Sequence, residues 1–235
     1  MNNVEFSYLI KNAQYKTKYE PIIDIETNEI YGYEALSKFE IDQSVITTDD
    51  VFKKLHHYNK LFFELEKRNK NLQVENYDKK EKLFLNFDAD IVRSKEQQTY
   101  WENFFLVNNN KIVVEITENG SDDETSATIM RNFSQWLNDR GIDSALDDFA
   151  QDGSMFSFYI MDRSKYIKID KSFIFKIREN PNYIPYLKGL LETIKLNNQK
   201  SIIEGVETKE DFDLVKSLNC DYVQGYYFSD LILIR

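Results

Sequence analysis

Residues 111–119 of the chain read KIVVEITEN, in which a short apolar run typical of a buried β-strand ends on a carboxylate, Glu115. The same order, an apolar run followed by a polar side chain, recurs along the chain. The runs LFLNF, SALDD, YIKID and SIIEG lead to Asn86, to Asp147 with Asp148, to Lys168 with Asp170, and to Glu204. One buried strand that ends on an acid could be chance, whereas the repetition predicts that these polar groups are brought to a common place.

Strand-like and helix-like segments alternate through most of the chain. Residues 19–39 read as two strands joined at 26–29, a turn short enough to make them antiparallel. Further strands are predicted at 83–87, 112–116, 142–148, 166–170, 201–205 and 220–228, and helices at 51–73, 94–107, 126–141, 172–200 (interrupted near Pro181 and Pro185) and 207–219. Alternation of this length predicts an α/β fold, a modified TIM-type (β/α)8 barrel with one antiparallel strand.

The composition is that of a globular protein with an acidic surface. The chain of 235 residues is long enough for one barrel, and 42 % of its residues are hydrophobic. The net charge of −10 disfavours binding to a DNA or RNA duplex or to an anionic membrane, although local cations or bound metals can still attract a small anion. Cys220 is the only cysteine, and no apolar run approaches the ~20 residues that span a bilayer. We therefore expect a cytoplasmic protein without membrane insertion, with an N-terminal arm or short helix at 1–18 and a barrel domain at 19–235.

In a closed parallel barrel the C-terminal ends of the strands meet at one mouth, where functional residues gather. The residues predicted to lie there are Glu34, Asn86, Glu115, Asp147, Asp148, Lys168, Glu204 and Gln224. Carboxylates crowded in this way would not all ionise unaided, and bound divalent cations resolve that conflict. A donor set of oxygens, without Cys or His, favours hard ions such as Mg²⁺ or Mn²⁺ over zinc. Two such ions about 4 Å apart are a standard arrangement for phosphoryl transfer, in which Lys168 would orient or help deprotonate the attacking water.

Each of these residues has a simpler explanation when it is taken alone. Glu34 fits a solvated acid at a strand end, and Lys168 fits a surface lysine of the barrel. The adjacent Asp147 and Asp148 fit a cap on the following turn, which is a common role for such a pair. None of these explanations accounts for polar residues that recur at the same end of successive strands, so the functional interpretation is favoured for the set.

These motifs resemble those of the EAL-domain family of cyclic di-GMP phosphodiesterases, over almost the whole chain from about Tyr19 to Phe228. The triplet that names the family stands at Glu34-Ala35-Leu36, within YGYEALSKF. LFLNF is similar to the family's asparagine strand, IVVEITE to its second-glutamate motif and SALDDF to its paired-aspartate motif. KIDKSFI, IIEGVET and CDYVQGYYFS are similar to its three C-terminal signatures, in that order. One such motif would be weak support, but seven in the right order are highly specific.

The resemblance implies hydrolysis of one phosphodiester bond in cyclic di-GMP, which opens the ring to linear pGpG, with two divalent cations, Mg²⁺ or Mn²⁺. The implied ligands of the first ion are Glu34, Asn86, Glu115 and Asp147, and those of the second are Asp147 and Asp148, with Glu204 close by. The implied catalytic residues are Lys168, on the nucleophilic water, Glu204 and Glu34. Implied substrate-binding residues are Glu20, Pro21, Leu36, Lys38, Gln224 and Gly225, and implied supporting residues are Glu118, Asp170 and Glu207.

The sequence departs from the family's usual pattern near the proposed site. The loop after Asp148 reads FAQDGSM where the family usually has FGTGYSS, so two glycines are lost and an acid, Asp152, is gained. In the family this loop helps to order the second metal site and the contact of a homodimer. Lys38 replaces an arginine that faces a substrate phosphate, which keeps the charge but loses the bidentate fork. Glu20 stands where glutamine is common.

Two hypotheses follow from this pattern. The first is an active metal-dependent phosphodiesterase, and it is favoured because every metal ligand and Lys168 are present. The second is a catalytically weak or inactive EAL domain that acts as a receptor for cyclic di-GMP or as a protein-interaction module. The altered loop is the feature that favours the second hypothesis. Production of pGpG distinguishes them.

Overall fold

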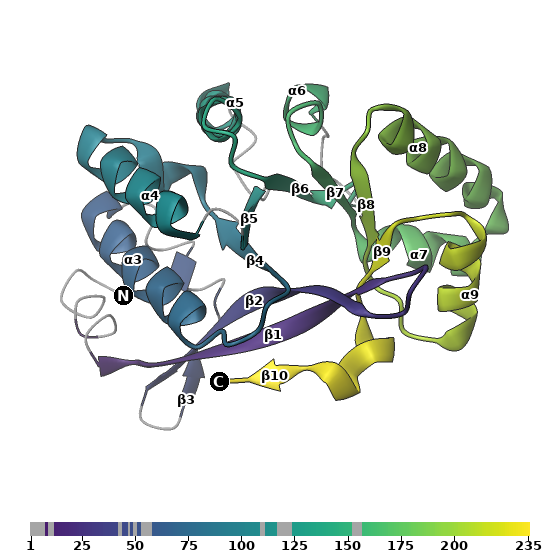
Figure 1. Ribbon diagram of the computed structural model, residues 1–235, viewed down its shortest axis with the longest axis horizontal. Coiled ribbons are helices and arrows are strands. Elements are labelled where there is room, and N and C mark those ends of the chain that lie inside the picture. The colour runs from purple at the N-terminus through teal and green to yellow at the C-terminus, as the bar shows by residue number, and fades with distance from the viewer. Residues whose placement is uncertain are drawn as a thin grey trace.

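The computed structural model describes residues 8, 12–41, 44–46, 48, 51–52, 58–108, 111–116, 124–151 and 157–235, without the side chains of 41, 44–46 and 124–127. In Figure 1 the helices lie to the left, above and to the right of the central strands, whereas the purple N-terminal strands and the yellow C-terminal strand run along the lower edge. The prediction for Glu118 and most of the altered loop, residues 152–155, falls outside the described residues.

Eight strands close into a barrel. They are β1 (Gln14–Asp24), β2 (Ile30–Ile41), β4 (Lys82–Phe87), β5 (Ile112–Ile116), β6 (Ser144–Phe149), β7 (Tyr166–Ile169), β8 (Lys200–Ile203) and β9 (Tyr222–Val223). The hydrogen-bonded order runs β1-β9-β8-β7-β6-β5-β4-β2, and the pairing of β2 with β1 closes it. All pairings are parallel except those of β1 with its two neighbours. The predicted barrel with one antiparallel strand is confirmed.

Two short strands extend the sheet outside the barrel. β3 (Ser44–Ile46) pairs with the far end of β2, and β10 (Leu233–Ile234) pairs with β1. β1 begins at Gln14, ahead of the position at which the sequence analysis starts the barrel domain. The division of the chain at residue 18 stays a prediction.

The helices follow the strands in the predicted alternation. They are α3 (Asn59–Glu75), α4 (Lys95–Asn108), α5 (Glu124–Asn138), α6 (Phe158–Met161), α7 (Lys171–Glu179), α8 (Ile184–Leu196) and α9 (Lys209–Ser217), with 3-10 turns η1 (Ala89–Val92), η2 (Pro181–Tyr183) and η3 (Tyr226–Leu231). The predicted break at 172–200 is found between α7 and α8, where Pro185 stands in the first turn of α8. Among the described residues, none of the helices has the length and apolar character needed to cross a bilayer.

The last strand is shorter than predicted. The sequence predicts a strand over 220–228, but β9 covers only Tyr222–Val223 and η3 follows it. Gly225 turns the chain against the strand end: a Cβ at that position would lie 2.3 Å from the carbonyl oxygen of Val206. The chain can pass this point only because glycine has no side chain.

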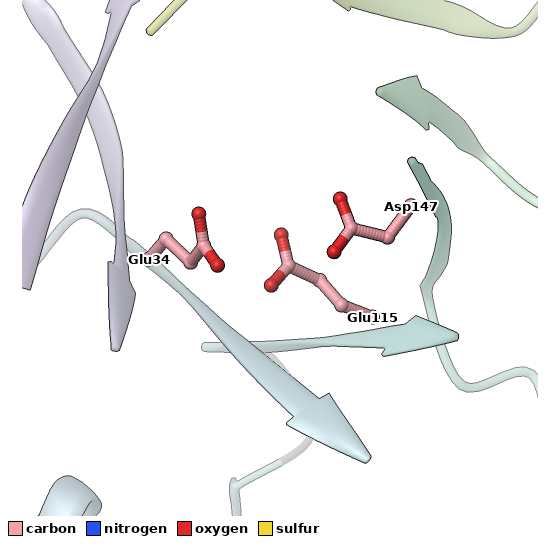
Figure 2. Close-up of side chains that lie close together, drawn as sticks. All are labelled: Glu34, Glu115 and Asp147. Carbon is pink, nitrogen blue, oxygen red and sulfur yellow. The ribbon is translucent and has the colours of Figure 1, made fainter. Parts of the chain in front are cut away.

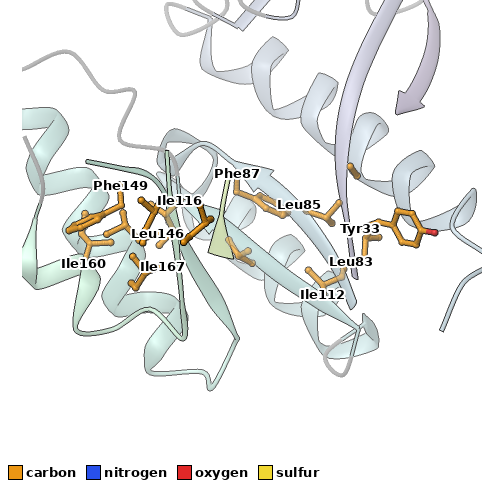
Figure 3. Packing of buried hydrophobic residues seen from close by; sticks show 14 of the residues in the cluster. Tyr33, Leu83, Leu85, Phe87, Ile112, Ile116, Leu146, Phe149, Ile160 and Ile167 are labelled. Carbon is orange, nitrogen blue, oxygen red and sulfur yellow. The ribbon is translucent and has the colours of Figure 1, made fainter. Parts of the chain in front are cut away.

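Alternation along the strands divides the side chains into an outward-facing set and an inward-facing set. One set faces outward and forms the main core between the strands and the helices, as Figure 3 shows for Leu83, Leu85 and Phe87 of β4. The other set faces the barrel interior, where a smaller apolar cluster is formed by Ile22, Phe84, Val113, Ala145, Tyr166, Ile202 and Tyr222. Because side chains on a strand alternate with a period of two, the residue two positions beyond each member of this cluster also faces the interior.

A candidate metal centre at the mouth of the barrel

The polar residues at the strand ends stand directly above the inner apolar cluster. Each lies two positions along its strand from a member of that cluster, so it faces the same interior one pleat closer to the mouth. The pairs are Phe84 and Asn86, Val113 and Glu115, Ala145 and Asp147, Tyr166 and Lys168, Ile202 and Glu204, Tyr222 and Gln224, and, on the antiparallel strand, Ile22 and Glu20. The period-two rule was available in the sequence, but it could not be applied before the inner face was known.

Lys168 lies at the centre of the site. Its Nζ is 2.7 Å from Asp147 Oδ1, 2.8 Å from Glu115 Oε1, 2.9 Å from Glu204 Oε1 and 3.2 Å from Glu34 Oε2. The side chain is 1 % exposed. One ammonium group therefore contacts four carboxylates that come from four strand ends. This places Lys168, Glu34, Glu115, Asp147 and Glu204 together, as the sequence predicts.

Two amides fix the orientation of Glu34. Asn86 donates a hydrogen bond from Nδ2 to Glu34 Oε1 at 2.9 Å, and Gln224 donates from Nε2 to Glu34 Oε2 at 2.7 Å. Gln224 also lies 3.3 Å from Glu20 Oε2, which links β1 to the same cluster. Both amides are thus part of the site, on opposite sides of the carboxylate that they hold.

The carboxylates are more than one lysine can satisfy. Figure 2 shows Glu34, Glu115 and Asp147 pointing toward one another across the interior. Glu115 is fully buried, and neither of its oxygens accepts a well-aligned hydrogen bond from a described residue, although Oε1 lies near the ammonium. Oδ1 of Asp147 likewise accepts no well-aligned hydrogen bond from a described residue, although it lies near the same ammonium. Buried oxygens without hydrogen-bond donors are costly unless a cation compensates them, so this donor set fits a metal centre.

The oxygens fall into two groups that share one residue. Oxygens of Glu34, Glu115 and Asp147 lie within 4.8 Å of one another, and so do oxygens of Asp147, Asp148 and Glu204. Two acidic groups that share Asp147 are the arrangement that two neighbouring cations require. The structure thus contains acidic clusters that can hold metal, of the oxygen-only type that hard ions prefer.

The electrostatics of the site differ from one carboxylate to the next. Burial raises the pKa of Glu115 well above its usual range, and the charge of Glu34 adds to this effect. Burial likewise raises the pKa of Glu204 to about 8 and that of Asp148 to about 6. For Glu34, burial alone would raise the pKa, but the charge of Lys168 and the two amide hydrogen bonds outweigh it and lower the pKa. Within the part of the chain that the structure describes, Lys168 is the cation that contacts these carboxylates, so the negative charge of the site exceeds its positive charge.

The chain turns sharply after Asp147. Asp148 and Ala150 have φ angles of 53° and 65°, in the left-handed region that residues with side chains seldom adopt. The backbone N–H of Gln151 donates to the carbonyl of Asp148 at 3.0 Å and closes the turn. Ala150 stands where the resemblance places one of the missing glycines, so the substitution there leaves a strained backbone.

The supporting residues lie next to the site rather than in it. Asp170 is buried and caps α7, accepting from the backbone N–H of Ser172 at 2.9 Å. This fixes the start of α7 directly after Lys168. Glu207 accepts from Arg178 Nη1 at 3.0 Å, at the far end of the loop that carries Glu204.

Arg178 is a supporting residue that the sequence analysis missed. From the end of α7 it donates to both oxygens of Asp211, Nε to Oδ1 at 2.9 Å and Nη2 to Oδ2 at 2.5 Å. Asp211 also accepts from the backbone N–H groups of Glu207 and Thr208, as part of the capping box of α9. A basic residue in the last turn of a helix is common because it suits the helix dipole, so Arg178 carried no distinguishing signal.

The predicted substrate-binding residues separate into two groups. Glu20, Leu36 and Lys38 lie on the inner face of β1 and β2, in the pairs Glu20↔Glu34, Lys18↔Leu36 and Lys16↔Lys38. Pro21 pairs with Tyr33, and the alternation of β1 puts it on the outer face, away from the carboxylates. Their roles toward a substrate stay predictions.

Comparisons with known proteins agree with this arrangement. A family model described as EAL domain matches residues 3–230. The chain is 27 % identical, over 94 % of its length, to the oxygen sensor protein DosP of Escherichia coli (strain K12), and 25 % identical, over 96 %, to the probable cyclic di-GMP phosphodiesterase PdeN of the same organism. It covers 28 % and 45 % of those two proteins, so it spans between a quarter and a half of their length.

A solved structure shares the fold at low identity. The FimX EAL domain from Pseudomonas aeruginosa, bound to c-di-GMP, superposes with a TM-score of 0.79 and 17 % identity, covering 96 % of this chain and 94 % of that one. The similarity supports the closed barrel with its antiparallel strand. Together with the family match over residues 3–230, it shows that the chain belongs to the EAL domain family.

Proposed function

We propose that the protein is a metal-dependent phosphodiesterase that hydrolyses cyclic di-GMP to linear pGpG. The observation that carries the proposal is the pair of acidic groups that share Asp147 and surround Lys168. The names of family relatives such as PdeN support the substrate class. The reaction adds water to one phosphorus and breaks one P–O3′ bond, which leaves a 5′-phosphate on one nucleotide and a free 3′-hydroxyl on the other.

The proposed metals are Mg²⁺ or Mn²⁺. Glu34, Asn86, Glu115 and Asp147 would hold one ion, and Asp147, Asp148 and Glu204 the other. The ions would supply Lewis-acid stabilisation of the phosphate charge and acidify a bound water. Asn86 would have to turn its amide so that Oδ1 rather than Nδ2 faces the ion, since Nδ2 donates to Glu34 without metal.

Lys168 is the residue of this chain that acts on the attacking water. Its ammonium is surrounded by carboxylates, which hold the pKa of Lys168 well above the ordinary value against the effect of burial. It therefore stays protonated and serves as a donor that orients the water oxygen. Glu204, whose Oε1 lies 2.9 Å from the ammonium, would accept the water proton in its ionised form, which bound cations would favour. Glu34 holds its position between the two amides as a ligand.

The remaining roles concern recognition of the nucleotide. Glu20 would accept from a guanine edge, held by its contact with Gln224. Lys38, with Leu36 beside it on β2, would face a phosphate. Gly225 would let the substrate approach the backbone after β9, and Pro21 would act only through the shape of β1.

The alternative function is a receptor for cyclic di-GMP with negligible turnover. The left-handed backbone at Ala150, in the loop that follows the two aspartates, is the observation that favours it. A strained loop next to Asp148 would weaken the second ion site, which hydrolysis requires and binding does not.

The deciding experiment measures pGpG formation with Mg²⁺ and with Mn²⁺, beside cyclic di-GMP binding in chelator. We expect metal-dependent pGpG and its loss in Glu34→Ala. Tight binding in chelator without pGpG under either metal would replace the enzyme by the receptor. A homodimer and a cytoplasmic location belong to the same proposal, and light scattering of the purified protein and cell fractionation test them.

A further inference from the structure

The hairpin of β1 and β2 continues beyond the barrel mouth. β2 pairs with β4 only over Gly32–Ala35, whereas its pairing with β1 continues to Glu40. Beyond Ala35 the other neighbour of β2 is the short strand β3. In Figure 1 this part of the hairpin extends past β4 toward β3. The residues from Leu36 onward therefore form a wall that rises from the edge of the metal centre.

One face of this wall continues the interior of the barrel. The opposite face is covered by the core, where Tyr15 packs edge-on against Phe39 at 5.3 Å between ring centroids and Tyr19 donates to the carbonyl of Gln73 in α3. The even-numbered residues of both strands thus share the face of Glu34. The ion pair between Lys16 and Glu40 confirms that these two side chains lie on one face.

Two lysines stand directly opposite each other on that face. Lys16 of β1 and Lys38 of β2 are cross-strand partners, and like charges in such a position destabilise a sheet. Lys16 is compensated by Glu40, with Nζ 2.7 Å from Oε2. Within the described residues, Lys38 has no acidic partner. In a chain with a net charge of −10, this leaves an excess positive charge at a place where an anion would relieve the repulsion.

The next lysine along the same face, Lys18, already has an acidic partner. Lys18 contacts Glu20, which in turn contacts Gln224 at the metal centre. Among the described residues, the charge without an acidic partner therefore lies at Lys38, directly opposite Lys16, two pleats and about 13 Å along β2 from Glu34. The flexible four-carbon stems of both lysines allow the ammonium groups to reach back toward the mouth.

We propose that Lys16 joins Lys38 in a two-lysine subsite that binds the second phosphate of the cyclic dinucleotide, the one that is not cleaved. Two ammonium groups, one for each non-bridging oxygen, would provide the two donors that a single guanidinium provides through its fork. Lys16 is a substrate-specificity residue in this scheme, because a phosphodiester with one phosphate has nothing to place there. The inference rests on the proposed substrate, but it concerns binding and is separable from turnover.

The test is calorimetric titration of the full chain with cyclic di-GMP in chelator, where no hydrolysis occurs. Loss of one charge-assisted hydrogen bond to phosphate at a half-exposed lysine should weaken binding about 5- to 10-fold in Lys16→Gln. Lys188→Gln is the matched control, since Lys188 is an exposed lysine of α8 with the same charge change, and it should stay within about twofold of wild type. Thermal unfolding of both variants checks that the fold is intact.

A second variant tests the two-donor geometry itself. Lys38→Arg, added to Lys16→Gln, restores a bidentate donor and should recover most of the lost affinity, which loss of fold or of general charge would not predict. With metal, Lys16→Gln should raise KM for cyclic di-GMP while bis(4-nitrophenyl) phosphate, a diester with one phosphate, is cleaved with an unchanged kcat/KM. Absence of binding by wild type, equal affinity of Lys16→Gln and Lys188→Gln, or failure of the arginine to rescue would overturn the inference. Absence of pGpG with intact binding would overturn the proposed function alone.

Discussion

The barrel interior holds two layers of side chains, one pleat apart on the same strands, that are built in opposite ways. In the lower layer Tyr31 stacks on Tyr222 at 4.0 Å, and its hydroxyl pairs with that of Tyr166 at 2.5 Å. Polar atoms there have partners within an apolar cluster. In the upper layer Glu115 and Asp147 keep buried oxygens that accept no well-aligned hydrogen bond from a described residue and share one ammonium, that of Lys168. The lower layer contributes stability, whereas the upper layer reduces stability in exchange for a place to bind cations.

The largest expected effect is on activity, from a change in the upper layer. Asp147→Asn removes the carboxylate that the two acidic groups share, so both ion sites are impaired. We expect kcat/KM for cyclic di-GMP to fall by about 1000-fold or more. Asp143→Asn is the control, because Asp143 lies at the opposite end of the barrel, where it pairs with Lys165. An Asp147→Asn variant with wild-type turnover would contradict the shared-ligand assignment.

The second effect is on stability, from a change in the lower layer. Tyr166 is fully buried, and Tyr166→Ala should lower the free energy of unfolding by about 3–5 kcal/mol because it leaves a cavity at the barrel base. Urea denaturation measures this loss. Tyr166→Phe keeps the ring and should cost about 1 kcal/mol, the value of its hydroxyl contact. If Tyr166→Ala were as stable as Tyr166→Phe, the lower layer would not stabilise the barrel through its apolar packing.

The sequence was sufficient to predict which polar residues lie together at the barrel mouth, because strand ends and acids are both local signals. An apolar run that stops at Glu115 or Asp147 can be recognised without knowing what lies beside it. The barrel followed from alternation, and the antiparallel strand followed from a short turn. The barrel and its antiparallel strand, which follow from signals within short segments, are confirmed, whereas the roles of the site residues stay predictions.

The features that the sequence did not reveal depend on contacts between segments. The end of β9 is set by the approach of Gly225 to Val206, and Arg178 acts on Asp211, which lies 33 positions further along the chain. The outward position of Pro21 follows from the register of β1 with β2. A helix within 149–164, α6, was not predicted because four residues are too few for a periodic pattern to be recognised.

The third effect is on stability, from a change in the upper layer. Glu115→Gln removes one of the four carboxylates that crowd around the single ammonium of Lys168, so in chelator it should raise the free energy of unfolding by about 1 kcal/mol. Wild type should gain thermal stability when Mg²⁺ or Mn²⁺ is added, since a ligand of the folded state alone stabilises it, and the variant should gain much less. Differential scanning fluorimetry with and without metal measures both. Equal metal-induced shifts would show that Glu115 is not a ligand.

The loop after the aspartates provides a smaller test. Ala150 has a left-handed backbone that costs about 1 kcal/mol relative to glycine, so Ala150→Gly should raise the free energy of unfolding by up to this amount. If strain at Ala150 also weakens the second ion site, the same variant should lower the metal concentration required for turnover. Gly141→Ala is the matched control in the other direction: Gly141 has a φ of 63° with nothing near its Cβ position, so alanine there should cost a similar amount and leave activity unchanged. Higher stability with unchanged metal dependence would show that the strain at Ala150 does not weaken the second ion site.

The smallest expected effect concerns Asp211, in the first turn of α9, which contrasts with Glu204 at the end of β8. Burial raises the pKa of Glu204 to about 8, whereas for Asp211 the hydrogen bonds from Arg178 and the backbone outweigh burial and lower the pKa to about 2. An acid whose pKa is lower in the folded state than in the unfolded state stabilises the fold above its unfolded pKa, near 4, and this contribution disappears as the pH falls toward 2. Arg178→Gln should therefore reduce stability at pH 6 and make the decline between pH 4 and pH 2 shallower, as measured by urea denaturation at each pH. A decline as steep as that of wild type would mean that the backbone N–H groups of Glu207 and Thr208, and not the guanidinium, determine the ionisation of Asp211.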